Sequence, residues 1–178
     1  MKHRTPFLLL LLATAAWGQT QSRVLVATGT QAMKTLVSPG ALFCVGGAPT
    51  GLWPQMPPCL PGTTRILFTY RNALFENQQV SGSAANLIAG TLNVVTHCNL
   101  DAYGYGHCWG HFEWEIPGAG GKWEGSWSGM FDVATNSSSY SGTGYGYGGK
   151  LEGLRIQCQW ADSAPDKPTT LIASISGL

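Results

Sequence analysis

Residues 107–116 read HCWGHFEWEI, and residues 122–128 read KWEGSWS. In both stretches every second residue is apolar or glycine, while most of the residues between them are polar or charged. This period of two is typical of a β-strand with one face on a core and the other in water, because successive side chains point to opposite sides. The two stretches therefore predict neighbouring strands of a sheet that is wetted on one face.

The same alternation continues on both sides of these stretches, over residues 66–71, 91–98 and 153–160. Between the alternating stretches lie turn-forming residues, PGAGG at 117–121 and NSSS at 136–139, which predict short connections. No helical pattern of useful length interrupts the series, which disfavours parallel βαβ units. The order of strands and turns predicts an antiparallel meander.

We expect an all-β fold, a single antiparallel meander closed into a seven- or eight-stranded barrel, with an irregular Pro/Gly-rich N-terminal arm. A sandwich is the other way in which such a meander could bury its apolar face. Glycines within the strands favour the barrel, because closing a sheet needs sharp coiling that glycine permits. These glycines are Gly110, Gly125, Gly142, Gly144, Gly146 and Gly148.

The N-terminus has the pattern of a signal peptide. Lys2 and Arg4 precede an unbroken apolar run at 7–12, and the small-x-small sequence at 16–18 predicts cleavage before Gln19. The apolar run is shorter than the roughly twenty residues that span a bilayer, so we expect no membrane span in the mature chain. The expected location is outside the cell or in the periplasm.

The remaining boundaries follow from the alternation. Residues 1–18 form the expected signal peptide. Residues 19–62 form the irregular arm, with one strand near 41–45. Residues 63–162 form the barrel, and residues 163–178 form a C-terminal tail or the last strand.

Composition excludes several classes of protein. Charged residues make up only 11% of the chain and glycine contributes 24 residues, which argues against coiled coils, helical bundles and charged disordered tails. The formal net charge is +1 and there is no Lys/Arg cluster to neutralise phosphates. We expect no nucleic-acid partner.

Five cysteines in an exported chain predict disulfides, with at most two bridges and one cysteine left over. Cys44 and Cys59 flank a Pro-rich loop, which a bridge would close. Cys98 and Cys108 flank an expected hairpin connection and could face each other across it. Cys158 is then unpaired, although a Cys98–Cys158 bridge remains open on the sequence alone.

Aromatic residues give the main functional signal, with seven Trp and six Tyr in the chain. Trp123 and Trp127 share one strand face with Gly125 between them, which would leave a shallow gap two side chains wide. Inside a barrel the gap would be an apolar ligand pocket, outside it would be a stacking platform for sugar rings, and simple core packing is the third reading. The candidate ligand-binding residues are Trp123, Trp127, Trp114, Phe112, Tyr145, Tyr147 and Ile156.

Three catalytic or metal-binding readings have weaker support. His107, His111 and Glu113 share a strand face with His97 across the hairpin, but His107 and His111 would lie roughly 13 Å apart on one strand, too far for one metal ion. The glycine run at 142–149 lacks the Gly-Lys-Ser/Thr of a phosphate loop. A glycosidase would need two converging carboxyl groups from Glu113, Glu115, Glu124 and Asp132. We expect no metal and no cofactor.

A family resemblance rests on glycine and aromatic motifs between residues 80 and 160. These are Val80-Ser81-Gly82, Gly104-Tyr105-Gly106, Gly110-His111-Phe112, and the stretches 121–129 and 144–154. The region resembles the small secreted β-barrels of the allene oxide cyclase-like and dirigent-like group, of the calycin type, and is similar to bacterial exported proteins of uncharacterised role. The resemblance implies a barrel fold and carries over no catalytic residue.

The sequence thus predicts a secreted, non-enzymatic β-barrel that binds a small apolar molecule inside. The first alternative is a carbohydrate-binding module that holds a polysaccharide on exposed Trp and Tyr side chains. The second is an enzyme like the cyclases and isomerases of the resembled group. Catalytic residues and oligomeric state do not follow from the sequence.

Overall fold

The computed structural model describes residues 24–38, 40–46, 59, 62–135, 137–162 and 169–177. The expected signal peptide at 1–18 lies outside this part of the chain. Within it, no helix is long and apolar enough to cross a membrane.

The described chain is a single antiparallel sheet of nine strands with three short 3-10 helices between them. The strands are β1 (Leu25–Ser38), β2 (Leu42–Val45), β3 (Arg65–Gly82), β4 (Thr91–Asp101), β5 (Tyr105–Ile116), β6 (Gly121–Asp132), β7 (Ser137–Tyr147), β8 (Arg155–Asp162) and β9 (Thr169–Ser176). The 3-10 helices are η1 (Ala85–Leu87), η2 (Pro117–Ala119) and η3 (Gly149–Leu151).

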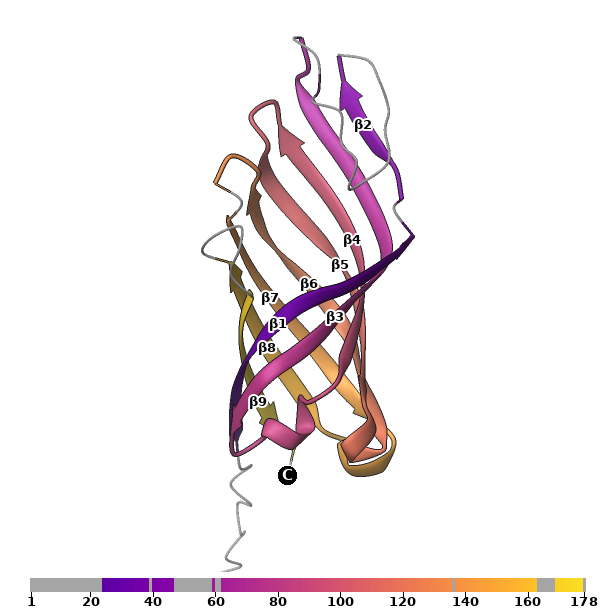
Figure 1. Ribbon diagram of the computed structural model, residues 1–178, viewed down its shortest axis with the longest axis vertical. Coiled ribbons are helices and arrows are strands. Elements are labelled where there is room, and N and C mark those ends of the chain that lie inside the picture. The colour runs from indigo at the N-terminus through magenta and orange to yellow at the C-terminus, as the bar shows by residue number, and fades with distance from the viewer. Residues whose placement is uncertain are drawn as a thin grey trace, which may run out of the picture.

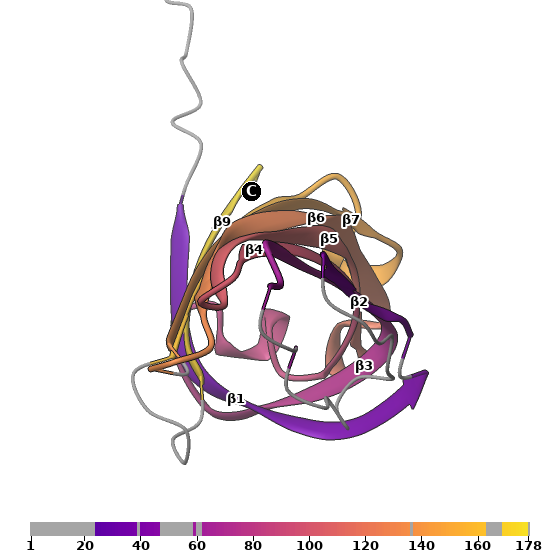
Figure 2. The same cartoon turned by 90° about the horizontal axis from the view of Figure 1, so that it is seen from above.

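The sheet closes on itself into a ring of eight strands. From β3 to β9 each strand pairs with the next along the chain, and β1 lies between β9 and β3. Figure 2 shows this ring from above, with β1 and β3 side by side where the sheet closes. The predicted all-β meander and its closure are confirmed.

β2 follows β1 as a pairing partner of β3. β1 pairs with β3 as far as Arg71, and β2 then pairs with residues 65–68 of the same strand. β2 therefore lies beyond the ring, at the end where β3 and β4 extend furthest (Figure 1). A strand was predicted at 41–45, and β2 confirms it.

The irregular arm predicted over residues 19–62 is wrong for residues 25–38, which form β1 and close the ring. The period of two was hidden because the register of β1 against β3 shifts twice, between Thr28 and Thr30 and between Met33 and Thr35. Each such irregularity moves the following side chains to the other face. At the other end of the chain, β9 settles the alternatives for residues 163–178 in favour of a last strand.

The turn between β6 and β7 lies earlier than the sequence predicted. β7 already begins at Ser137, and the carboxylate of Asp132 accepts hydrogen bonds from the backbone N–H groups of Ala134 and Thr135, at 2.9 and 3.4 Å. The Thr135 side chain and these backbone groups hold the pKa of Asp132 below its ordinary value. The carboxylate thus replaces the backbone partners that the tight turn lacks.

The interior of the ring is apolar. Along β4 and β5 buried residues alternate with more exposed ones, so that one face of each strand forms the core. Trp114 and Trp123 are 0% exposed and Ile156 is 1% exposed. The indole N–H of Trp123 donates to the carbonyl of Leu87 in η1 at 2.8 Å, which fixes η1 across the lower end of the ring (Figure 1).

Aromatic rings occupy the space that inward glycines leave. A Cβ added at Gly142 would lie 2.8 Å from Cζ3 of Trp160, and one added at Gly144 would lie 2.9 Å from Cζ of Phe112. Large side chains on β5 and β8 therefore lie directly against the backbone of β7. The glycines permit both the coiling of the sheet and the packing of its core.

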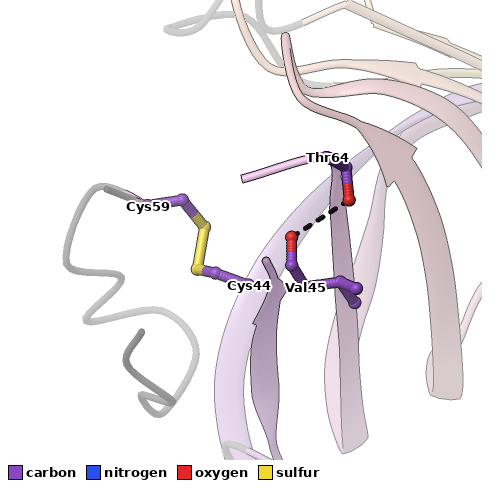
Figure 3. The surroundings of a disulfide bond; sticks show 4 residues. All are labelled: Cys44, Val45, Cys59 and Thr64. Atoms are coloured by element: carbon purple, nitrogen blue, oxygen red, sulfur yellow. Dashed lines mark hydrogen bonds between the residues drawn. A yellow bond between two sulfur atoms is a disulfide. The ribbon is translucent and has the colours of Figure 1, made fainter. Parts of the chain in front are cut away.

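Two disulfides are formed, Cys44–Cys59 and Cys98–Cys108, as the sequence favoured. Cys98 and Cys108 are directly opposite each other on β4 and β5, with their Cα atoms 4.1 Å apart. Cys44–Cys59 ties β2 to the chain before β3, next to a 3.2 Å hydrogen bond from the Thr64 hydroxyl to the Val45 carbonyl (Figure 3). Cys158 is free and buried, and burial raises the pKa of its thiol. Two disulfides indicate an oxidising compartment.

Replacement of Gly142 tests the packing of aromatic rings on glycine. Gly142→Ala should lower the free energy of unfolding by about 1–3 kcal/mol, because the methyl group would overlap Trp160. Ser141→Ala, one residue away on the exposed face, should change it by less than about 0.5 kcal/mol. Urea unfolding of both variants measures this. Equal losses of stability in the two variants would contradict the close packing of Trp160 against Gly142.

Removal of the disulfide within the ring tests its contribution. Replacing Cys98 and Cys108 together with Ala should lower the free energy of unfolding by about 2–3 kcal/mol, since the bridge closes a chain separation of 10 residues. Urea unfolding under non-reducing conditions, in a Cys158→Ala background that prevents exchange, gives the value. An unchanged stability would mean that the bridge is not formed in solution.

Candidate functional site

The candidate site lies on the outer face of the ring, across β5 to β9. Strand pairing aligns one outward residue from each of these strands into a transverse row. We call this the floor row. Its members are His111, Ser126, Thr143, Gln157 and Ser174.

A second outward row runs along one side of the floor row. It begins with Trp109 on β5 and ends with Ile172 on β9, which are 41% and 44% exposed. Between them lie small or polar side chains, Ser128, Ser141 and Gln159. We call this the tryptophan row.

A third outward row runs along the other side. It consists of Glu113, Glu124, Tyr145 and Arg155. The guanidinium carbon of Arg155 lies 5.3 Å from the centroid of the Tyr145 ring, a cation–π contact. We call this the carboxylate row.

The three rows enclose a shallow groove. Because Ser and Thr side chains are short, the middle of the face is hollowed between the larger residues of its borders. Three connected hollows, of about 620, 650 and 380 Å³, follow one another across the strands. The first two share His111, Ser126 and Thr143, and the last two share Ser141 and Gln159. We call this continuous hollow the outer groove.

The Trp109 ring is held by two histidines. The His107 ring stacks on it with centroids 5.4 Å apart and planes at 15°, and the His97 ring lies 5.9 Å away at 31°. His107 precedes Trp109 on the same face of β5, and His97 is its partner on β4. These contacts restrict the orientation of an indole that remains partly exposed at the border of the outer groove.

Lys122 joins the two carboxylates of the groove. Its ammonium lies 3.1 Å from Oε2 of Glu113 and 2.6 Å from Oε1 of Glu124. Hydrogen bonds to Glu124 and Glu113 raise the pKa of Lys122 above its ordinary value, so that it stays charged over the physiological range. All three side chains are partly exposed, so the ion pairs contribute little to stability.

This arrangement argues against a glycosidase. Glu113 and Glu124 do converge, but a general acid needs a carboxyl group that is still protonated near neutral pH. Both carboxylates are instead ion-paired with the ammonium of Lys122. Glu115 and Asp132 line none of the three hollows.

The histidines do not form a metal centre in the part of the chain that is described, where no group of three or more His, Cys, Asp or Glu side chains could hold an ion. His97 and His107 both pack on Trp109, and Cys98 and Cys108 are bonded to each other.

The seven residues predicted to bind a ligand do not lie on one face of the ring. Trp114, Trp123, Trp127, Phe112 and Ile156 are buried inside the ring, whereas Tyr145 and Tyr147 are 53% and 48% exposed on its outside. The reason is the period of β7, in which Gly142, Gly144 and Gly146 take the inward positions and leave the outward ones to tyrosine.

The buried members of that set pack against one another. They belong to one continuous cluster of buried side chains, and neither solvent nor a water-sized void touches Trp114 or Trp123, which have no exposed surface. Phe112 meets Trp160 edge to face with centroids 6.1 Å apart, and Trp127 meets Tyr140 in the same way at 5.0 Å. At the level of these residues the interior is a packed core.

Four polar atoms of this core have no hydrogen-bond partner. They are the hydroxyl of Thr96 and the indole nitrogens of Trp114, Trp127 and Trp160. Nε1 of Trp127 lies 3.1 Å from where a Cβ on Gly110 would be, and Gly110 is the partner of Thr96 on the next strand. The absence of a side chain at Gly110 thus makes room for the indole.

No family model, curated protein or solved structure matches this chain. The resemblance to allene oxide cyclase-like and dirigent-like barrels therefore stays a prediction. The site has to be judged on its own geometry.

The groove residues could be found in the sequence only in part. Trp109 alternates in phase with His107, His111 and Glu113, which marks it as an outward tryptophan of β5. The floor row was not predicted, because single Ser, Thr and Gln residues on four strands carry no signal until strand pairing aligns them.

Replacement of Thr96 distinguishes a packed core from an internal polar site. Thr96→Val removes an unpartnered buried hydroxyl and should leave the free energy of unfolding unchanged or raise it by up to about 1–2 kcal/mol. Trp123→Phe, which removes a formed hydrogen bond, should lower it by about 1–3 kcal/mol. Thermal and urea unfolding measure both. A loss of stability in Thr96→Val would show that the hydroxyl has a partner in solution.

Proposed function

We propose that this protein is an exported, non-enzymatic glycan-binding protein that holds a sugar chain in the outer groove. The observation that carries the proposal is a floor of hydroxyl and amide side chains bordered by exposed aromatic rings, Trp109 on one side and Tyr145 on the other. This is the carbohydrate-binding alternative of the sequence analysis, with Trp109 and Tyr145 as the exposed rings in place of Trp123 and Trp127.

The chemistry of the groove matches that of a sugar ring. A sugar has apolar C–H faces and a rim of hydroxyl groups that both donate and accept hydrogen bonds. An indole or phenol ring offers a flat apolar surface for the C–H face. The side chains of Ser126, Thr143 and Gln157 can donate hydrogen bonds to the sugar hydroxyl groups and accept hydrogen bonds from them.

The sheet also preorganises the groove. Ser and Thr have few rotamers, and their backbones are fixed by strand pairing on both sides. Less side-chain entropy is therefore lost on binding than with long flexible side chains. The floor row crosses five strands, about 19 Å at the usual strand spacing, which is long enough for a chain of several sugar rings.

The other two functions have less support. An apolar ligand inside the ring would need space beside Trp123 and Ile156, which are 0% and 1% exposed in a packed cluster. A cyclase would need a poised acid or base in an apolar pocket. Among the described residues, the buried polar groups of the core without a hydrogen-bond partner are a threonine hydroxyl and indole nitrogens, which supply neither.

The proposed location is outside the cytoplasm, reached through the signal peptide predicted at residues 1–18. The two disulfides support it, because they persist in oxidising compartments. A polysaccharide partner would be met there.

Replacement of the groove aromatics tests the proposal. Isothermal titration against soluble polysaccharides, both neutral and anionic, should identify a ligand for the wild type. Trp109→Ala and Tyr145→Ala should each weaken that binding at least about tenfold, or roughly 1.4 kcal/mol, because each removes a stacking surface. Both variants should unfold at the wild-type urea concentration.

Tyr103→Ala is the matched control. Tyr103 is 87% exposed on the turn between β4 and β5 and lines none of the three hollows. It should bind as the wild type does. Equal losses in the Trp109 and Tyr103 variants, or no binding of any polysaccharide by the wild type, would contradict the proposal.

A further inference from the structure

The outer groove has a distinct charge. Its three hollows are lined by described residues that include two carboxylates, Glu113 and Glu124, and neither lysine nor arginine. The rest of the lining holds no Asp, Lys or Arg side chain. A ligand in the groove therefore meets negative charge at the β4–β6 end and neutral donors and acceptors elsewhere.

The nearby cations are already engaged. Lys122 contacts both Glu113 and Glu124, and the guanidinium of Arg155 lies over the Tyr145 ring. The charges of Glu113, Glu124 and Lys122 sum to minus one at the β5–β6 end of the carboxylate row, and the positive charge of Arg155 lies at the β8 end of that row. An anionic group here would lie beside two carboxylates and one ammonium.

We infer that the outer groove selects uncharged glycans and that Glu113 and Glu124 exclude polyanionic ones. This inference rests on the proposed function. Carboxylates accept hydrogen bonds from sugar hydroxyls, and such charge-assisted bonds are the stronger kind. The carboxylates of a uronic acid chain, or its sulfate groups, would instead lie close to Glu113 and Glu124 as like charges.

Because the rows are closely spaced, an anionic sugar chain that occupies the whole groove lies near Glu113 and Glu124 and is repelled by them. The carboxylate row is adjacent to the floor row, two residues along β5 and β6, or about 7 Å. This is within the Debye length of about 8 Å at physiological ionic strength, so the repulsion is only partly screened.

The experiment compares neutral hexose oligomers with uronic acid oligomers of the same length and linkage by isothermal titration. The wild type should bind the neutral series at least about tenfold more tightly at low salt, and the ratio should fall as salt is added. Changing both Glu113→Gln and Glu124→Gln should reduce the ratio to within about threefold, chiefly by strengthening the binding of the uronic acid series.

Glu115→Gln is the matched control, because Glu115 lies on the same face of β5, is exposed and lines none of the hollows. It should keep most of the wild-type ratio. Equal binding of both series by the wild type, or tighter binding of uronic acids, would overturn the selectivity and leave the proposed function standing, provided that Trp109→Ala abolishes the binding. Failure of every oligomer to bind the wild type would overturn both.

Discussion

Closure of a single sheet by the pairing of β1 with β3 is the constraint on which the whole structure depends. Once the ring is closed, each strand has one inward and one outward face, and a residue's place in the alternation decides whether it belongs to the core or to the surface. The core can then be packed with tryptophan, because glycines on β6 and β7 let the rings lie against the backbone. The outer surface carries the three rows of side chains that form the outer groove.

The same glycines connect the core to the groove. On β7, glycine at the inward positions 142, 144 and 146 leaves Thr143 and Tyr145 as the outward neighbours of Gly144. The strand thereby takes part in a tight core on one side and in a hydroxyl-lined hollow on the other. The outer groove thus lies on a closed sheet in which its strands are paired on both sides.

Much of the fold could be predicted because burial on one face imposes a period of two, and that period is visible over β4, β5, β6 and β8. β1 could not be predicted, because two register shifts break its period of two. This strand closes the ring by backbone pairing, and its sequence shows no pattern of large apolar residues. The disulfide partners followed from their positions beside turns. The predicted ligand residues fall on two faces of the ring, because large aromatics such as Trp123 dominate the sequence, whereas the floor row of the proposed site exists only across strands.

The most direct test of this account is the indole N–H region of a proton–nitrogen correlation spectrum, recorded while a neutral oligosaccharide is added. The tryptophans report both faces of the ring at once, since Trp109 is on the outside while Trp123, Trp127 and Trp160 are inside. Binding in the outer groove should move the Trp109 indole signal and leave those of the buried indoles in place. Movement of the Trp127 and Trp160 signals, with that of Trp109 unchanged, would show that the ligand enters the ring and would contradict the account.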